Sequence, residues 1–235
     1  MTALIAIDQG TTSTRVVAFD KELNIIYSEQ KEYPLLYPND GWVEIQPDEL
    51  MNSVYSTIDP VINICPDILS CGITNQRETT LVWDADSGEP IYNAIVWQDR
   101  RTADYCLQLK QAGYEEIIIK KTGLLLDPYF SSTKVSWILD NVDGARARAE
   151  AGRLRFGTVD TYLMWQLSNG DIFKTDITNA SRTNLFNIHT KTWDDELLKI
   201  FNVPASMLPD VHSSDSNFGK LKRGDRSIQI TGVIG

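Results

Sequence analysis

A short polar segment, Asp8 to Arg15 (DQGTTSTR), lies between two apolar stretches and has the composition of an anion-binding turn. A glycine lets successive backbone N–H groups point toward one centre, hydroxyls add donors, and an arginine adds a fixed positive charge. Phosphate is the natural ligand of such a turn. The carboxylate of Asp8 would repel a phosphate unless a divalent cation lay between them, so the segment indicates Mg²⁺ and a nucleotide.

Two other interpretations of this segment have to be weighed. The common glycine-rich phosphate loops, GxxxxGK[ST] and GxGxxG, do not occur, which leaves a phosphate-binding β-hairpin. A structural hairpin with surface hydroxyls would have a similar composition. Composition alone does not separate these two readings of the hairpin.

A second polar cluster, Asn75 to Glu78 (NQRE), interrupts two apolar stretches. Its groups could be buried only if a partner satisfied their hydrogen bonds. The adjacent Arg77 and Glu78 offer donors and acceptors together, which suits a polyol whose hydroxyls both donate and accept. The alternative is an exposed turn with a surface ion pair, which would contribute only about 0–1 kcal/mol.

Two aromatic residues, Trp97 and Tyr129, stand at the ends of apolar runs. An indole that packs against carbon atoms, together with a phenol hydroxyl, is common in sites for small polyols. Either residue taken singly could equally belong to the core. Neither His189 nor His212 has the Asp or Ser spacing of a catalytic histidine.

The first third of the chain must supply strands that position the polar segments. Alternating and β-branched residues predict consecutive strands over Leu4–Asp8, Arg15–Asp20 and Ile25–Tyr33. After a polar, proline-rich loop, Pro47 and the carboxylates that follow it indicate the start of a helix, which we expect to run to about Ile58.

The rest of the chain turns from strands to helices. We expect strands over Ser70–Thr74, Thr79–Trp83 and Ala94–Trp97, and a last strand over Ser227–Gly235. Apolar residues at helical spacing predict helices around Val135–Val142, Phe156–Leu167 and Trp193–Phe201. Strands thus come first along the chain and helices follow, and there is no internal repeat or linker. This order predicts an α/β or α+β fold in one main unit.

Composition limits the classes of partner. The 235 residues carry a formal net charge of -10, which argues against nucleic acid and against anionic membranes. The three cysteines have no CxxC pair, so we expect buried free thiols. No leader peptide and no run of 18 apolar residues is found, so we expect a cytoplasmic protein without integral membrane contact.

A colinear series of motifs extends over almost the whole chain. With it the sequence resembles the FGGY carbohydrate kinases, and within them the branch that phosphorylates glycerol. The series is DQGTTSTR, GWVEIQP, GITNQRETT, PIYNAIVWQDRR, TGLLLDPYFSSTK, FGTVDTYLMWQL, TNASRTNLFNIHT and WDDELL. The resemblance implies an actin-like ATPase fold, made of two ribonuclease-H-like domains with a mixed sheet, antiparallel first strands and flanking helices. Residues 1–235 would be the N-terminal domain, and the C-terminal nucleotide domain would be absent from this chain.

The resemblance also implies roles for individual residues. The nucleotide phosphates would be contacted by Thr11, Thr12, Ser13 and Arg15, and Asp8 would orient water on Mg²⁺. Glycerol would be hydrogen-bonded by Arg77, Glu78 and Tyr129, with Trp97 against its carbon atoms. The catalytic base of the family is an Asp in a GxxGDQ segment, and we expect it just after Gly235, so that this chain holds no catalytic base.

The activity implied is the ATP-dependent phosphorylation of glycerol to sn-glycerol 3-phosphate, by a complete protein that is a homo-oligomer. This chain alone would be inactive. Two alternatives stay open. One is a related kinase that acts on a larger polyol or ketose. The other is a nucleotide-dependent switch like actin or the Hsp70 ATPase domain, which would have no use for a polyol pocket.

Overall fold

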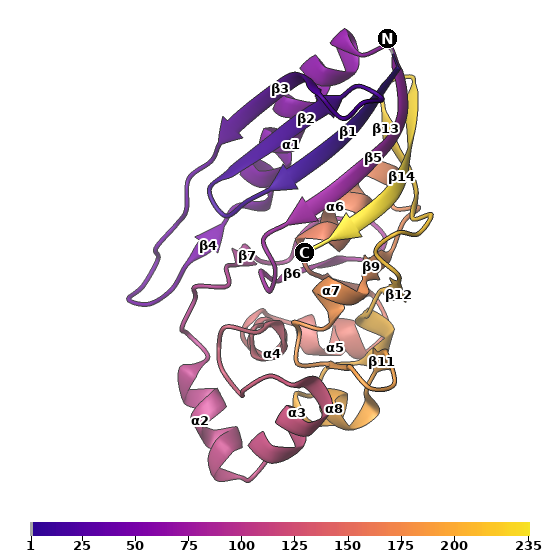
Figure 1. The fold of residues 1–235 in the computed structure, drawn as a ribbon. Helices are drawn as coiled ribbons and strands as arrows, with labels where there is room; N and C mark the ends of the chain where they lie inside the picture. The colour runs from indigo at the N-terminus through magenta and orange to yellow at the C-terminus, as the bar shows by residue number, and fades with distance from the viewer. Residues whose placement is uncertain (1) are drawn as a thin grey trace.

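In the computed structural model, which describes residues 2–235, a six-stranded sheet lies above a group of helices (Figure 1). The strand order is β13-β14-β5-β1-β2-β3. The strands span β1 Thr2–Gln9, β2 Ser13–Phe19, β3 Ile25–Glu32, β5 Asp67–Asn75, β13 Gly219–Arg223 and β14 Arg226–Ile234. Strands β1, β5 and β14 run parallel to one another, whereas β2, β3 and β13 are antiparallel to the neighbours they pair with.

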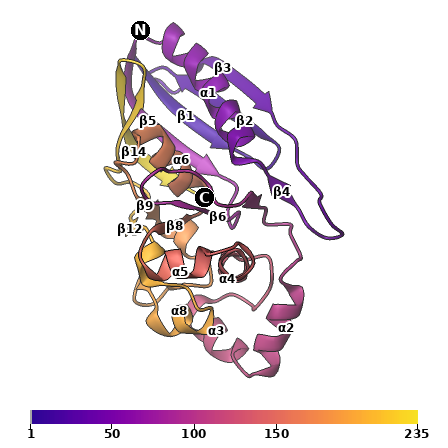
Figure 2. The same ribbon diagram turned by 180° about the vertical axis from the view of Figure 1, so that it is seen from behind.

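One face of this sheet is packed and the other is more open. Along β1 the buried side chains alternate with half-buried ones, so that Ile5 and Ile7 point to the same side. Helices α1 (Pro47–Ile64) and α6 (Val159–Ser168) cover that side, α1 behind β2 and β3 and α6 behind β13 and β5 (Figures 1 and 2). The antiparallel opening hairpins and the fold class predicted from the sequence are confirmed.

Helix α1 is longer than its sequence pattern indicated. The helix begins at Pro47 as expected, but it continues past Ile58 and through Pro60 to Ile64. A proline inside a helix removes one N–H donor and is unfavourable. The turn after Pro60 is held because Val61 and Ile62 are buried against the sheet in the same row as Ile58.

The lower half of the molecule has its own core. It is built from α2 Ala103–Gln111, α3 Glu115–Thr122, α4 Ser131–Asn141, α5 Ala145–Glu150 and α8 Asp195–Ile200, with a 3-10 turn over Ala205–Met207. The helix predicted around Val135 is confirmed as α4, and Val135, Ile138 and Leu139 are buried in this second cluster.

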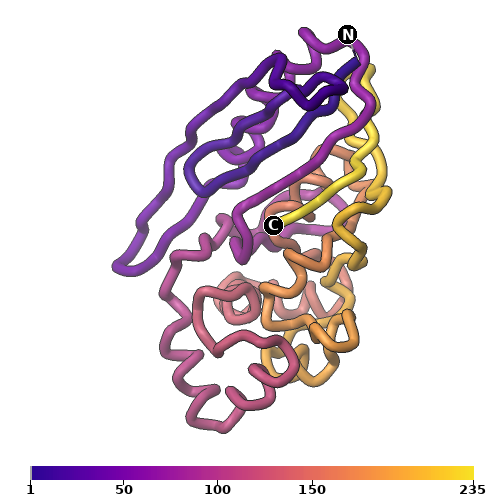
Figure 3. The backbone as a smooth tube through the Cα atoms, in the orientation of Figure 1, coloured from indigo at the N-terminus to yellow at the C-terminus, as the bar shows by residue number. Residues whose placement is uncertain are grey.

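Four short strand pairs lie outside the large sheet. They are β4 Glu44–Ile45 with β7 Ala94–Ile95, β6 Leu81–Asp84 with β8 Leu154–Gly157, β9 Lys174–Asp176 with β12 Asp210–His212, and β10 Phe186–Asn187 with β11 Thr192–Trp193. A one-turn helix, α7 (Ile177–Ala180), follows β9. The chain then returns to the sheet, and the end of β14 reaches the middle of the molecule (Figure 3).

Two predicted helices begin later than expected. Phe156 and Gly157 belong to strand β8, because they pair with Val82 and Leu81 of β6. Trp193 belongs to strand β11. Helix α8 begins after Asp194, whose carboxylate accepts hydrogen bonds from two backbone N–H groups of its first turn.

The prediction of buried free thiols is confirmed. Cys65, Cys71 and Cys106 are free and buried, and burial raises the pKa of the Cys71 thiol to about 12. Within the described residues, no helix combines the length and the apolar character that a membrane span requires.

The contact between α1 and the sheet gives a stability prediction. Ile58 is fully buried, so we expect Ile58→Ala to lower the free energy of unfolding by about 2–5 kcal/mol, because a cavity remains at the sheet. Urea denaturation measures this difference. Ser56→Ala, on the exposed side of the same helix, is the matched control and should stay within about 0.5 kcal/mol of the wild type. Equal effects of the two changes would contradict the packing described here.

Candidate active site

Three segments far apart in the sequence meet at one edge of the sheet. The parallel register places Gln9 opposite Asn75 and Thr74 opposite Ile234, so β1, β5 and β14 end at the same level. The segments that follow them are therefore neighbours: the turn over residues 10–12, the loop over residues 76–78, and Gly235. The loop and the turn are also joined directly, since the backbone N–H of Gln76 donates to the carbonyl of Gln9 at 2.7 Å.

The turn between β1 and β2 is closed by its own backbone. The N–H of Gly10 donates to the carbonyl of Ser13 at 2.9 Å. Thr11 and Ser13 are half-buried, whereas Thr12 and Arg15 are exposed at the rim. Across the hairpin, the side chains of Asp8 and Arg15 lie 3.5 Å apart, and both are about half exposed. Such a pair contributes little stability and leaves both groups accessible.

Glu78 is held in an unusual backbone conformation. Its φ is 62°, in the left-handed region that a side chain like glutamate rarely adopts. Its side chain is buried, and Oε1 accepts a hydrogen bond from Nε of Arg182 at 2.5 Å. The Glu78 carbonyl accepts from Oγ of Ser131 at 3.1 Å. The exposed turn with an Arg77–Glu78 ion pair, weighed as an alternative, is therefore wrong.

Arg182 joins Glu78 to the aromatic residues of the site. Its guanidinium lies over the rings of Phe130 and Tyr129, at 4.9 and 5.6 Å from their centroids. The rings of Tyr129 and Trp97 have centroids 5.4 Å apart. Sequence reasoning missed Arg182, although it lies in the motif TNASRTNLFNIHT. The sequence does not show that Arg182 contacts Glu78, because the two residues are 104 positions apart.

Arg77 lies beside the end of β14. It is half-buried, and a Cβ placed on Gly235 would be 2.6 Å from the Cγ of Arg77. The N–H of Gly235 donates to Oγ1 of Thr178 in α7 at 2.8 Å. The end of β14 is therefore fixed against the arginine.

The aromatic residues contact the turn directly. Nε1 of Trp97 donates to Oγ1 of Thr11 at 3.0 Å, although the two residues are 86 positions apart. Contacts thus join Thr11 to Trp97, Trp97 to Tyr129, and Tyr129 through Arg182 to Glu78. The structure brings these members of the two predicted groups together. Arg77 precedes Glu78 in the chain, and Asp8, Thr12, Ser13 and Arg15 lie on the same hairpin as Thr11.

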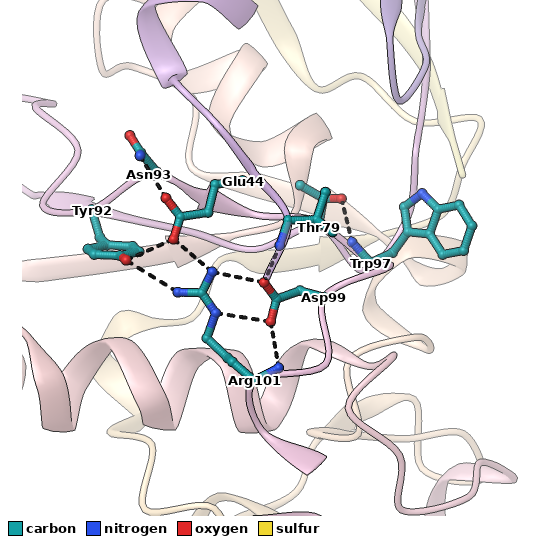
Figure 4. A network of polar contacts seen from close by, with 8 residues as sticks. Glu44, Thr79, Tyr92, Asn93, Trp97, Asp99 and Arg101 are labelled. Atoms are coloured by element: carbon teal, nitrogen blue, oxygen red, sulfur yellow. Dashed lines mark hydrogen bonds and ion pairs between the residues drawn. The ribbon is translucent and has the colours of Figure 1, made fainter. Parts of the chain in front are cut away.

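A buried cation holds the segment that carries Trp97 (Figure 4). The guanidinium of Arg101 is fully buried and donates from Nη2 to Asp99 at 2.8 Å and to Glu44 at 2.7 Å. Nε of Arg101 donates to the other oxygen of Asp99 at 3.0 Å, and Nη1 donates to the hydroxyl of Tyr92 at 3.3 Å. Asp99 also accepts from the backbone N–H of Val43 at 2.6 Å.

The same guanidinium is enclosed by aromatic rings. It lies 3.9 Å from the ring centroid of Trp42 and 4.5 Å from that of Trp137. Trp42 precedes β4, and Trp137 belongs to α4 of the lower half. Arg101 therefore ties the upper and lower halves together four residues after Trp97. The sequence WQDRR contained this pair of charges, but no pattern indicated that it is buried.

Lys134 is a buried amine next to the site. It is fully buried in α4, and its Nζ donates to the carbonyls of Tyr129 and Phe130. None of the ion pairs among residues 2–235 includes it. Desolvation lowers the pKa of Lys134 to about 7, and the negative charge of Glu78 acts in the opposite direction.

The fold defines the class of this protein. The mixed sheet, with antiparallel opening strands and flanking helices, is that of the actin-like, ribonuclease-H-like fold. The chain belongs to the FGGY family of carbohydrate kinases, since the sequence model of that family's N-terminal domain matches residues 3–233.

Individual relatives agree with this assignment. The chain is 55% identical to a glycerol kinase of Alteromonas mediterranea and 53% identical to one of Allorhizobium ampelinum, over 99% of its length and 48% of theirs. A crystal structure of Plasmodium falciparum glycerol kinase with ADP superposes with a TM-score of 0.96 at 37% identity, over the whole chain and 48% of the other. The chain thus spans about half the length of the curated relatives it matches.

The Arg101 cluster leads to a prediction on stability. We expect Arg101→Met to lower the free energy of unfolding by about 3–5 kcal/mol, because Asp99 and Glu44 would remain buried without a counter-charge. Thermal and urea unfolding measure the loss. Adding Asp99→Asn and Glu44→Gln removes the unpaired charges and should restore part of the stability. A loss below about 1 kcal/mol in the single variant would refute the role given to the cluster.

Lys134 leads to a prediction on pH. Between the folded pKa of about 7 and the ordinary value of 10.5, the unfolded chain binds a proton that the folded chain lacks. The free energy of unfolding therefore rises with pH in this interval. Lys134→Met lacks this dependence, so the wild type should gain stability relative to the variant from pH 7 to pH 9.5. Urea titrations at both pH values measure the difference, and a constant gap would contradict it.

Proposed function

We propose that this chain forms the N-terminal half of an ATP-dependent glycerol kinase, which transfers the terminal phosphoryl group of ATP to glycerol and yields sn-glycerol 3-phosphate. The observation that carries the proposal is the contact between the turn and the aromatic residues, in which Trp97 donates to Thr11 at 3.0 Å. A phosphoryl group held at the turn would thus be adjacent to an alcohol held at the aromatic residues. The names of the relatives at 55% and 53% identity support glycerol as the acceptor.

The acceptor site is proposed to consist of Arg77, Glu78, Trp97 and Tyr129. A buried carboxylate accepts from hydroxyls, and a half-buried guanidinium donates to them. The paired rings of Trp97 and Tyr129 offer an apolar surface for the carbon atoms of a small polyol. Because Arg182 already engages one oxygen of Glu78, that carboxylate is oriented before a ligand arrives.

The phosphate site is proposed to consist of Thr11, Thr12, Ser13 and Arg15. Their hydroxyls and the accessible guanidinium suit phosphate oxygens. Among residues 2–235, no three His, Cys, Asp or Glu side chains form a cluster that could hold a metal ion. This fits a Mg²⁺ ion that is bound mainly by phosphate and water, with the accessible carboxylate of Asp8 orienting one of the waters.

The rest of the enzyme is proposed to follow this chain. We place a nucleotide-binding second domain and the catalytic Asp after Gly235, beside Arg77, because the end of β14 packs against that arginine. The complete enzyme is proposed to be a cytoplasmic homo-oligomer, and the buried free thiols suit a reducing compartment. Phosphoryl transfer depends on positioning and charge stabilisation, so the chain alone should catalyse little or nothing.

An acceptor assay on the complete enzyme tests this function. ADP release is measured with ATP, Mg²⁺ and either glycerol, xylulose or gluconate. We expect turnover of the order of 1–100 s⁻¹ with glycerol and much less with the other two. Higher kcat/KM with xylulose or gluconate would instead indicate a related sugar kinase. ATP hydrolysis that no polyol stimulates would favour a nucleotide switch.

One substitution tests the acceptor site itself. We expect Arg77→Ala to weaken glycerol binding by about 1.5–3 kcal/mol, since a charged hydrogen-bond donor is lost. Calorimetry or the KM for glycerol at saturating ATP measures the change. Arg153→Ala, an exposed arginine in the loop before β8, is the control and should bind glycerol like the wild type. Unchanged glycerol affinity in Arg77→Ala would overturn the assignment of this residue.

A further inference from the structure

The aromatic residues and the turn are joined by hydrogen bonds along two routes. The direct route is the bond from the indole N–H of Trp97 to Oγ1 of Thr11. In the second route, the backbone N–H of Trp97 donates to Oγ1 of Thr79 at 3.2 Å, and that hydroxyl donates to Oε1 of Gln76 at 2.9 Å. Nε2 of Gln76 then donates to the carbonyl of Gly10 at 3.0 Å, inside the turn.

The second route is rigid because the side chains of Thr79 and Gln76 are buried and hydrogen-bonded. Thr79 has no exposed surface, and Gln76 is 9% exposed. The amide of Gln76 also lies 3.1 Å from Oε1 of Gln9 and 3.2 Å from the hydroxyl of Tyr33. Rotating either side chain would break buried hydrogen bonds, which is costly. This route therefore fixes the distance between the backbone of Trp97 and the turn.

The direct route sets the direction of a hydroxyl. A threonine hydroxyl has one hydrogen to donate and two lone pairs that accept. The Oγ1 atom of Thr11 accepts from the indole, and among the hydrogen bonds of residues 2–235 it has no other partner. Its own hydrogen is therefore available for an acceptor outside the chain. Phosphate oxygens are acceptors, so this donor suits a phosphate at the turn.

We propose that Trp97 is a positioning residue that couples the polyol site to the phosphate turn. A polyol against the ring fixes the indole, and the indole N–H holds the Thr11 hydroxyl so that its hydrogen points to the nucleotide phosphate. This inference rests on the proposed function of the chain. Because coupling between two ligands is reciprocal, glycerol and nucleotide should each raise the affinity for the other by the same factor.

A double-mutant cycle on the complete enzyme tests the coupling. The affinity for the Mg²⁺ complex of a non-hydrolysable ATP analogue is measured by calorimetry, with and without glycerol, and the ratio is the coupling factor. Trp97→Phe keeps an aromatic ring but lacks the N–H, and Thr11→Val keeps the shape but lacks the hydroxyl. We expect each change to lower the coupling factor roughly three- to ten-fold, the effect of one hydrogen bond. The double variant should lose no more than either single variant.

Control variants separate this bond from a general loss of structure. Trp193→Phe removes an indole N–H that donates to the carbonyl of Pro209 at 2.8 Å, outside the site, and should keep the wild-type coupling factor. Thr11→Ser retains the hydroxyl and should keep it as well. Circular dichroism and urea unfolding show whether each variant is folded.

The outcomes are distinct. The proposal is overturned if the wild-type coupling factor is one, or if Trp97→Phe leaves the coupling factor undiminished. It is also overturned if the losses add in the double variant, or if Thr11→Ser and Thr11→Val lose the same amount of coupling. If the wild type phosphorylates glycerol and only the cycle fails, the coupling is refuted and the proposed function stands. If no polyol stimulates ADP release, the proposed function itself has failed.

Discussion

The parallel register of β1, β5 and β14 is the constraint on which the site depends. The carboxyl ends of parallel strands meet at one edge of a sheet, and here Gln9 lies opposite Asn75 and Thr74 opposite Ile234. A slip of one residue in the β1–β5 pair would turn the buried side chains of β5 to the open face. It would also break the bond from Gln76 to Gln9 that ties the loop to the turn. The positions of the turn, the loop and Gly235 all follow from this register.

The lower half of the molecule also contributes side chains to the site. Tyr129 and Arg182 reach the site from segments around α4 and α7, and the buried Arg101 fastens the Trp97 segment to α4 through Trp137. The site is therefore shared between two cores. Its geometry depends on how these cores are held together, and a buried guanidinium that bonds to two carboxylates restricts that arrangement more than apolar contacts alone.

Much of the fold could be predicted from the sequence, because the opening strands and α4 have regular hydrophobic patterns. The errors occurred where tertiary contacts override the pattern. Phe156 and Trp193 fit a helical spacing but lie in strands, and α1 continues through Pro60 because buried residues follow it. Motif resemblance and local composition were enough to predict Thr11, Glu78, Trp97 and Tyr129 as site residues. Arg182, Arg101 and Lys134 could not be found this way, since their importance comes from burial and from partners distant in the sequence.

The backbone of Glu78 has a consequence for the way this chain can change over time. A left-handed conformation at a non-glycine residue costs about 1–3 kcal/mol, and Ser131 and Arg182 hold it in place. A glycine at this position would relieve the strain but would remove the carboxylate. Selection for heat resistance alone should therefore favour glycine at position 78, whereas selection for the proposed function should retain glutamate. The carboxylate is thus kept at a cost in stability, and selection for stability and selection for function act on the same codon.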